Sequence, residues 1–512
     1  MTNSEHALEL ILDGQIVGLG TGRAATAFVQ ELGERVKSGL RVRCVATSEV
    51  TATLARQVGI PMMTLDEALA AGGIDITIDG ADEVDLRMNL IKGWGGAHVR
   101  EKIVAAASRR LVILVTPEKL VPAVGSRGKL PVEVLPIAAR LVEQRLTALS
   151  LNSIVRQADG KPFVTDNGNV ILDTAVSSLD QPREFDATLR DIPGVVGTGL
   201  FVEMATDVFV QQDGWVEAWH EVARPSPPTP LPLRGRGGQT STPHPRPLSP
   251  EGRGEKSCDR AVVRVFSDAA RLSQSAAEAF VQIAQAAVTA RGRFTVALAG
   301  GSTPKRLYEL LATPPYRDRV DWSRTLIFFG DERCVPPDDA DSNYRMAIEI
   351  LLKRISSLSV EQAHRMMAER NDLDVAADDY AALIAHAFRV SSWTGEPPSI
   401  DLVLLGMGAD GHTASLFPNT VALDETERWV VANPVPQLGT FRVTLTVPLL
   451  NAARQVMFLI AGHDKAAALA DVLEGPADPQ RLPSQLIRPK SGGLAWLVDQ
   501  AAAARLKSIE PR

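Results

Sequence analysis

The sequence predicts an α/β protein of two domains, each with a mostly parallel sheet flanked by helices. Three observations lead to this fold class. The chain has 512 residues, more than one hydrophobic core usually organises. Short apolar runs alternate with helical patterns in both halves, and a Pro- and Gly-rich stretch separates the halves. We therefore expect domains at residues 1–222 and 259–512, with a linker at residues 223–258.

Composition excludes several classes of protein. The chain is 45% hydrophobic and 22% charged, as in an ordinary globular protein, and its formal net charge of -7 argues against binding nucleic acid or an anionic membrane. The start, MTNSEHALELILDG, has no basic segment before a long apolar run, and no stretch is long enough to span a bilayer. Its 3 cysteines are too far apart for a zinc site or a disulfide framework. These features predict a cytoplasmic protein.

In the first half, strand patterns such as GQIVGLG, IDITIDGAD and RLVILVTP alternate with the helical pattern AATAFVQELGERVKSG. The strand in IVGLGTGRAATAF runs through a glycine-rich turn into a helix that begins near Ala24. Backbone N–H groups in such a turn, together with the positive end of the helix, suit a sugar phosphate. Close packing of the turn is the structural alternative.

Acidic residues cluster after the second of these strands, in DITIDGADEVD, at Asp79, Asp82, Glu83 and Asp85. Clustered carboxylates indicate proton handling or metal binding, whereas a solvated acidic loop or a set of helix caps is the structural alternative.

A second motif, LIKGWGGAHVREKI, places Lys92 before a glycine turn and the pair Glu101 and Lys102 after it. Aldose–ketose isomerisation needs a carboxylate to move a proton between adjacent carbons and a cation or donor to stabilise the enediolate.

These motifs, with DNGNVILD and IPGVVGTGLFV, resemble the A-type ribose-5-phosphate isomerase family over nearly all of residues 1–222. The resemblance implies that Glu101 shuttles the proton and that Lys92 stabilises the enediolate. Asp79 and Asp82 would assist ring opening and bind sugar oxygens. Further substrate contacts are implied at Thr21, Gly22, Arg23, Ala24, Gly80, Ala81, Gly93, Trp94, Gly95 and Lys119.

Two positions depart from the family pattern. Arg23-Ala24 stands where the family has Ser-Thr, and Trp94 replaces a glycine. Arg23 either makes a charge-assisted phosphate contact or faces outward. We interpret Trp94 and the nearby His98 mainly as packing residues.

Between the halves, PSPPTPLPLRGRGGQTSTPHPRPLSPEGRGEK offers almost no apolar side chain for a core, so we expect a linker without fixed structure. A proline-rich ligand for a partner is the alternative. A flexible chain of about 35 residues has an end separation of roughly 30–36 Å, so the two domains can remain independent, with an organised interface between them as the alternative.

In the second half, RFTVALAGG, RTLIFFGDE, IDLVLLGMGADG and RQVMFLIAG repeat the pattern of a strand ending in a glycine or acidic turn. GGSTPKRLY supplies hydroxyl donors and a proline suited to a first helical turn.

Arg333 follows the acidic pair in GDE. It either binds a phosphate or an oxyanion, or it forms a salt bridge with its acidic neighbours. GMGADGHTASLFP places His412 at the start of a predicted helix, where it is suited to activate water, with Asp410 orienting it or the substrate.

This half resembles the 6-phosphogluconolactonases over about residues 260–505. The resemblance implies that His412 activates water for attack on the lactone, and that Arg333 and the turn of Gly300, Gly301 and Ser302 bind phosphate and polarised oxygen. Asp331, Asp410, Arg442 and Lys465 are further candidate contacts, although surface charge or a local salt bridge explains the last two equally well. Glucosamine-6-phosphate deaminases share the fold group, but GDER together with GADGHTASLFP favours lactone hydrolysis.

Together the two resemblances predict two domains of the ribose-5-phosphate isomerase and glucosamine-6-phosphate deaminase-like fold group. They imply a bifunctional enzyme of the pentose phosphate pathway that uses no metal or organic cofactor. Its expected partners are small-molecule sugar phosphates, without nucleic acid or membrane, and a second copy bound through the N-terminal domain. The alternative is a sugar-phosphate sensor in which one half is catalytically impaired.

Overall fold

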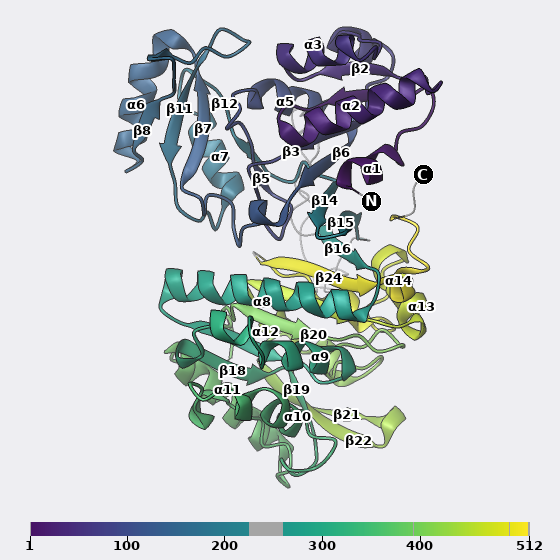
Figure 1. The fold of residues 1–512 in the computed structure, drawn as a ribbon. Coiled ribbons are helices and arrows are strands. Elements are labelled where there is room, and N and C mark those ends of the chain that lie inside the picture. The colour runs from purple at the N-terminus through teal and green to yellow at the C-terminus, as the bar shows by residue number, and fades with distance from the viewer. Residues whose placement is uncertain (1, 225–259, 393, 491, 510–512) are drawn as a thin grey trace, which may run out of the picture.

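One continuous sheet runs through both halves of the chain (Figure 1). The computed structural model describes residues 2–224, 260–392, 394–490 and 492–509. Its main sheet has 12 strands in the order β18-β17-β20-β23-β24-β16-β15-β14-β6-β3-β1-β2. Every strand is parallel to its neighbours except β15, which is antiparallel to both β14 and β16. The predicted α/β class with mostly parallel pairing is therefore confirmed.

The N-terminal half contributes six strands to this sheet, and the strands predicted at GQIVGLG, IDITIDGAD and RLVILVTP are β1, β3 and β6. Their apolar side chains are buried on both faces, as expected for parallel strands covered by helices. The strands are β1 Ile16–Leu19, β2 Arg43–Ala46, β3 Ile74–Gly80, β6 Ser108–Val115, β14 Asp207–Gln212 and β15 Trp215–Ala223. The helices are α1 Asn3–Leu8, α2 Arg23–Lys37, α3 Glu49–Gln57, α4 Leu65–Ala70 and α5 His98–Ala106.

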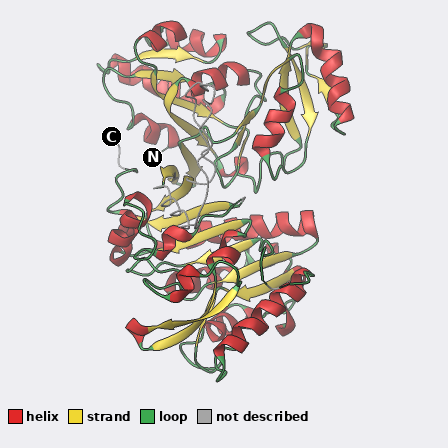
Figure 2. Cartoon of the chain, turned by 180° about the vertical axis from the view of Figure 1, so that it is seen from behind, coloured by secondary structure: helices red, strands yellow, loops and turns green. Residues whose placement is uncertain are grey.

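A smaller lobe of the N-terminal half stands beside the main sheet (Figure 2). It has a four-stranded antiparallel sheet in the order β12-β7-β11-β8, with its own apolar core. Its elements are β7 Lys129–Val134, α6 Ala139–Ala148, β8 Ser153–Val155, β11 Val170–Ala175, α7 Pro182–Arg190 and β12 Val195–Thr198. Short strands complete this half at β4 Glu83–Val84, β5 Leu90–Ile91, β9 Gln157–Ala158, β10 Lys161–Pro162 and β13 Leu200–Phe201.

The C-terminal half contributes the other six strands, and again the four predicted strands are present, as β17, β18, β20 and β23. Its strands in the main sheet are β16 Arg260–Phe266, β17 Phe294–Leu298, β18 Thr325–Phe329, β20 Leu402–Leu405, β23 Gln455–Ile460 and β24 Gly493–Asp499. A second sheet contains β19 Asp331–Arg333, β21 Val430–Val435 and β22 Thr440–Leu445. The helices are α8 Ala269–Arg291, α9 Ser302–Leu311, α10 Asn343–Ile350, α11 Leu373–Phe388, α12 Val447–Asn451, α13 Ala466–Glu474 and α14 Gln500–Ala503.

The two halves are joined by the pairing of β15 with β16, from Ala218 opposite Val265 to Ala223 opposite Arg260. The expectation of independent domains is wrong for this structure, because each half supplies one strand of the joining ladder. Loop composition predicts the reach of a connection but carries no information about strands that meet across it. The predicted linker itself lies outside the described residues, apart from its first two positions, and its lack of fixed structure stays a prediction.

Buried contacts reinforce this joint. Trp219 is fully buried and belongs to the same apolar cluster as Phe266 and Phe280 of the other half. The guanidinium of Arg264 lies 4.4 Å from the centre of the Trp219 ring and donates to Glu217, with Nε 2.8 Å from the carboxylate. Because both charged side chains are nearly inaccessible, each depends on the other for compensation.

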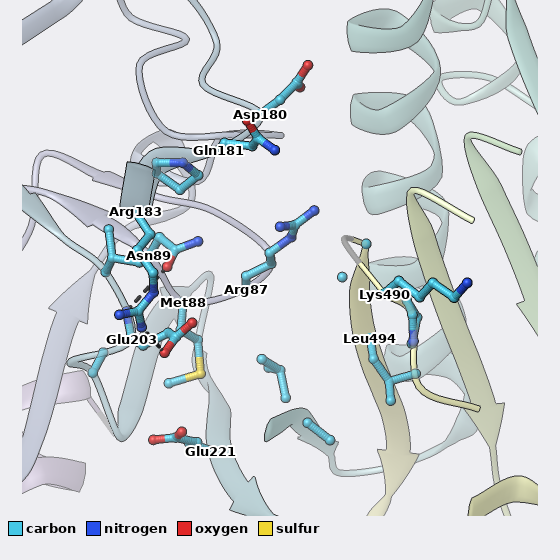
Figure 3. A pocket seen from close by; sticks show the side chains of 18 of the residues that line it. Arg87, Met88, Asn89, Asp180, Gln181, Arg183, Glu203, Glu221, Lys490 and Leu494 are labelled. Carbon is cyan, nitrogen blue, oxygen red and sulfur yellow. Dashed lines mark hydrogen bonds and ion pairs between the residues drawn. The ribbon is translucent and has the colours of Figure 1, made fainter. Parts of the chain in front are cut away.

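A cavity of about 300 Å³ lies between the halves (Figure 3). Arg87 and Arg183 of the N-terminal half line one side, and Lys490 and Leu494 of the C-terminal half line the other. Arg183 pairs with Glu203 within the cavity wall. Within the described part of the chain, no helix combines the length and apolar character that crossing a bilayer requires.

Cleavage of the chain between residues 225 and 259 should leave the two halves associated. A protease site introduced there should yield two fragments that co-elute in size exclusion and unfold in one thermal transition, because the β15–β16 ladder and its core remain. Glu217→Ala in the cleaved protein should weaken the association by about 3–5 kcal/mol, since Arg264 is left buried without its carboxylate. Glu143→Ala, on α6, serves as the control. Fragments that separate without any substitution would contradict the shared sheet.

Candidate functional sites

In the N-terminal half, one buried ammonium lies between two buried carboxylates. Lys92 Nζ is 3.0 Å from Asp79 Oδ2 and 3.3 Å from Glu101 Oε2, and none of the three side chains is more than 5% exposed. Asp79 comes from the carboxyl end of β3, Lys92 directly follows β5, and Glu101 lies in the first turn of α5. The structure therefore brings together three of the predicted catalytic residues.

Charge balance in this cluster leaves one of its two carboxylates without a compensating cation. Burial, followed by the nearby charge of Asp79, raises the pKa of Glu101 to about 8 although Lys92 opposes the shift. Burial also raises the pKa of Asp79, but the lysine and two backbone N–H groups, from Thr21 and Gly80, act against it. One cation balances only one of two carboxylates in a site that excludes water. We therefore assign the charge to Asp79 and the retained proton to Glu101.

Glycines allow the backbone to pack closely around these groups. A Cβ on Gly20 would lie 2.2 Å from Asp79 Oδ1, so no other residue fits between β1 and that carboxylate. Gly93 has φ +102 and lies against His98, whose ring would be 2.6 Å from a Cβ at that position. The pKa of His98 is lowered to about 3, chiefly by burial and then by the charge of Lys102. A neutral, buried ring supports the interpretation of His98 as a packing residue.

Trp94 connects Asp82 with the predicted contact Lys119. Its backbone N–H donates to Asp82 Oδ2 at 2.9 Å. Its ring lies 5.6 Å from Lys119 Nζ and 5.8 Å from Lys129 Nζ. Arg156 donates to the carbonyls of Gly93 and Trp94, which holds this turn in place. Trp94 therefore has a role besides packing, because its ring lies within cation–π distance of two lysine ammonium groups.

The turn at Thr21 lies beside the same cluster, with Gly22 as the N-cap of α2 and Arg23 exposed on its first turn. The sequence did not predict a set of neighbouring hydroxyl groups at this turn. Thr21 Oγ1 lies 2.8 Å from the hydroxyl oxygen of Thr47 and 2.8 Å from that of Ser48. The motif ATSEVTAT, which follows the strand at residues 43–46, was the available signal. The other predicted contacts lie nearby. Gly80 and Ala81 directly follow Asp79 in the chain, and Ala24 packs near Gly80. Gly95 is exposed in the turn after Trp94.

Two members of the acidic cluster have structural roles. Glu83 accepts the backbone N–H groups of Gly125 and Arg127, and Asp85 accepts those of Arg87 and Asn89. Among the described residues, no group of three or more His, Cys, Asp or Glu side chains is arranged to hold a metal ion.

In the C-terminal half, a cavity of about 590 Å³ opens where β17, β20 and β23 end. This placement is typical of parallel sheets, whose carboxyl ends meet along one edge. All nine residues that the sequence predicts for this site line the cavity: Gly300, Gly301, Ser302, Asp331, Arg333, Asp410, His412, Arg442 and Lys465.

His412 is held by Asp410 through a contact of 2.6 Å between Nδ1 and the carboxylate, and its ring stacks on Phe417. Burial alone would raise the pKa of Asp410, but its hydrogen bond with His412 holds that pKa below its ordinary value. The predicted helix at His412 is wrong: residues 406–420 form turns. Gly411 and Ala414 have φ values of +80 and +47, which interrupt a helix.

Two arginines lie opposite each other at the rim of this cavity. Arg333 on β19 is the cross-strand partner of Arg442 on β22. Burial, followed by the charge of Arg333, lowers the pKa of Arg442. Like charges placed directly opposite on a sheet destabilise it unless an anion lies between or beside them. This pair is therefore suited to bind a phosphate or an oxyanion.

Asp331 is anchored by two residues that the sequence analysis did not assign to the site. Ser415 donates to Asp331 Oδ2 at 2.5 Å, and Asn343 Nδ2 donates to the Asp331 carbonyl at 2.9 Å. Asn343 also accounts for the glycine at position 300, because a Cβ on Gly300 would lie 2.0 Å from the side-chain oxygen of Asn343. Glu332, by contrast, caps the start of α10 through the N–H groups of Asn343 and Tyr344.

Comparison with known proteins assigns a family to each half. Residues 43–214 match the model of ribose 5-phosphate isomerase A (phosphoriboisomerase A), and residues 267–496 match that of glucosamine-6-phosphate isomerases/6-phosphogluconolactonase. A ribose-5-phosphate isomerase A from Sphingopyxis alaskensis is 44% identical over 215 residues, which are 42% of this chain and 92% of that protein. One from Gloeobacter violaceus is 47% identical over 225 residues, 44% of this chain and 96% of that protein.

A 6-phosphogluconolactonase from a Nostoc species is 41% identical over 244 residues, 48% of this chain and 98% of that protein. Both resemblances predicted from the motifs are thereby confirmed. The chain belongs to the ribose-5-phosphate isomerase A family through its N-terminal half and to the glucosamine-6-phosphate isomerase/6-phosphogluconolactonase family through its C-terminal half.

Proposed function

We propose that this chain is a bifunctional enzyme of the pentose phosphate pathway. Its N-terminal half interconverts ribose 5-phosphate and ribulose 5-phosphate, and its C-terminal half hydrolyses 6-phosphogluconolactone to 6-phosphogluconate. The observation that carries the proposal is the presence, in one chain, of a buried Glu101–Lys92–Asp79 cluster and of a histidine–carboxylate pair facing two arginines. Two relatives that the chain covers at more than nine-tenths of their length carry these two enzyme names.

In the isomerase half, Glu101 removes the proton from C2 of the open-chain aldose and returns it to C1, while the hydroxyl proton of O2 passes to O1 and C2 becomes the carbonyl carbon. The buried ammonium of Lys92 stabilises the negative oxygen of the enediolate while the proton is on Glu101. Asp79 and Asp82 bind sugar oxygens and assist ring opening. The turn at Thr21–Ala24 and Lys119 contribute positive potential for the phosphate.

In the lactonase half, His412 takes a proton from water as the water attacks the lactone carbonyl. Asp410 orients the ring through Nδ1, which leaves Nε2 to act as the base. Arg333, Arg442 and Lys465 bind the phosphate and the developing oxyanion, with the turn at Gly300–Ser302 supplying N–H groups. Collapse of the tetrahedral intermediate breaks the bond between the carbonyl carbon and the ring oxygen, and His412 passes the proton it took from water to that departing oxygen, which yields the acid.

The two reactions are separated in space as well as in sequence. Seven strand steps lie between β3 and β20, so at about 4.8 Å per step the two sites are roughly 34 Å apart along the sheet. An oxidative decarboxylation separates the two steps in the pathway, so the product of one site is not the substrate of the other. A homodimer through the N-terminal half and a cytoplasmic location stay predictions.

Single substitutions in the intact chain should separate the two activities. Glu101→Gln should lower isomerase kcat by about 10²–10⁴-fold and His412→Ala should lower lactonase kcat by a similar factor, because each removes a general base. Coupled assays on both substrates measure the outcome, and each variant is the control for the other. A sugar-phosphate sensor would instead bind ribose 5-phosphate without turnover, with Glu101→Gln no worse than the parent.

Isomerase activity should rise with pH well above the range of a free carboxyl. Glu101 acts as a base only when ionised, and its pKa is raised to about 8, so kcat/KM should increase as pH passes upward through that region. A profile of kcat/KM from about pH 3.5 to about 9.5 tests this. An ascending limb near the ordinary pKa of 4.5 would contradict the buried, neutral assignment.

Trp94→Gly, which restores the residue typical of the family, should raise the KM for ribose 5-phosphate. Loss of the ring between Lys119 and Lys129 removes about 0.5–1 kcal/mol of cation–π interaction, equivalent to a change of roughly two- to fivefold. Trp94→Phe should retain most of the affinity. A fall in kcat with unchanged KM would mean that Trp94 acts on the chemistry and not on the position of Lys119.

A further inference from the structure

A second cavity in the C-terminal half lies at the edge of the sheet opposite the catalytic one. Its volume is about 460 Å³. It opens before β17, β20 and β23 begin, whereas the catalytic cavity opens after these strands end. A strand of five residues spans about 17 Å, so the two cavities are separate sites. Its lining consists of Arg291, Arg293, Thr295, Phe388, Arg389, Ser399, Asp401 and Arg454.

Positive charge dominates this cavity, which we call the arginine pocket. Among the described residues that line it, four are arginines and Asp401 is the one carboxylate. Asp401 is already bound: Arg291 Nε donates to Oδ1 at 2.9 Å, and the backbone N–H and hydroxyl of Thr295 donate to Oδ2. Arg454 lies further away, at 3.6 Å. The lining therefore keeps a formal excess of three positive charges.

Contacts behind the pocket hold some of these guanidinium groups in place. Arg293 donates to the carbonyl of Ala387 at 2.7 Å and lies 5.2 Å from the centre of the Phe388 ring. Arg389 is the C-cap of α11 in the left-handed conformation, with φ 58, and is exposed. Several cations fixed around one hollow repel each other, and a bound anion with more than one charge relieves that repulsion.

We propose that the arginine pocket is a second anion site, which binds a small phosphorylated metabolite apart from the catalytic centre. The guanidinium groups bind the phosphate in the bidentate manner that arginine favours. The Phe388 ring and the hydroxyl of Ser399 contact the organic part. None of the residues that line this pocket takes part in either proposed reaction, so the proposal can be tested independently of the two activities.

Hydrogen–deuterium exchange on the full chain locates the binding. Inorganic phosphate and 6-phosphogluconate, each up to about 10 mM, should slow exchange at residues 291–297, 383–390 and 451–457, as expected for a Kd of about 1 mM or below. Sodium chloride at equal ionic strength should not. Tighter binding of 6-phosphogluconate at these segments would identify an organic phosphate as the ligand, and equal binding would restrict the ligand to the phosphate group.

Two exposed arginines outside the catalytic machinery provide the decisive variant. Arg389→Gly with Arg454→Ala should weaken phosphate-dependent protection at these segments by at least about tenfold, because two charge-assisted contacts are lost. Lysine at both positions should retain part of the binding, and Arg505→Ala is the matched control. Lactonase kcat/KM without added anion should be unchanged. Absence of protection at these segments, or protection undiminished in the glycine–alanine variant, overturns the proposal.

Discussion

The antiparallel pairing of β15 with β16 is the constraint on which the architecture depends. Because β15 reverses direction once between two otherwise parallel sets, β16 runs in the same direction as β14. Every other strand of the main sheet therefore shares one direction, and the carboxyl ends of both halves lie along one edge. Both catalytic centres are built at that edge, and the arginine pocket lies at the other.

Buried charge determines what each centre does. In the N-terminal half, one ammonium serves two carboxylates, so the pKa of Glu101 is raised and its carboxylate is a stronger base once it is ionised. In the C-terminal half, the excess is positive, since Arg333 and Arg442 lie across from each other and His412 is paired with Asp410. The first centre is thus short of cations, which suits proton transfer, whereas the second has an excess of positive charge, which suits an anion.

Much of the site could be predicted from local sequence. Glycine turns, DGADE, KGWGG and GADGHTASLFP each place a reactive side chain directly after a strand, so residue type and strand position are encoded within a few residues. Ser415 and Asn343 were not assigned to the site, because they reach Asp331 from positions 84 and 12 residues away and their own motifs resemble ordinary turns. The helix expected at His412 is absent because Ala414 adopts a positive φ, which the local sequence does not reveal.

The sequence by itself determined the α/β class, the two families, the strands and a set of candidate site residues, because strand periodicity and turn motifs are local properties. Only the tertiary structure decided that β15 and β16 join the halves, that Lys92 lies between Asp79 and Glu101, and that four arginines line one pocket with Asp401. Each of these depends on side chains or strands that lie far apart in the sequence. Their energies come from burial and from charges brought within a few ångströms, and those distances exist only in the folded chain.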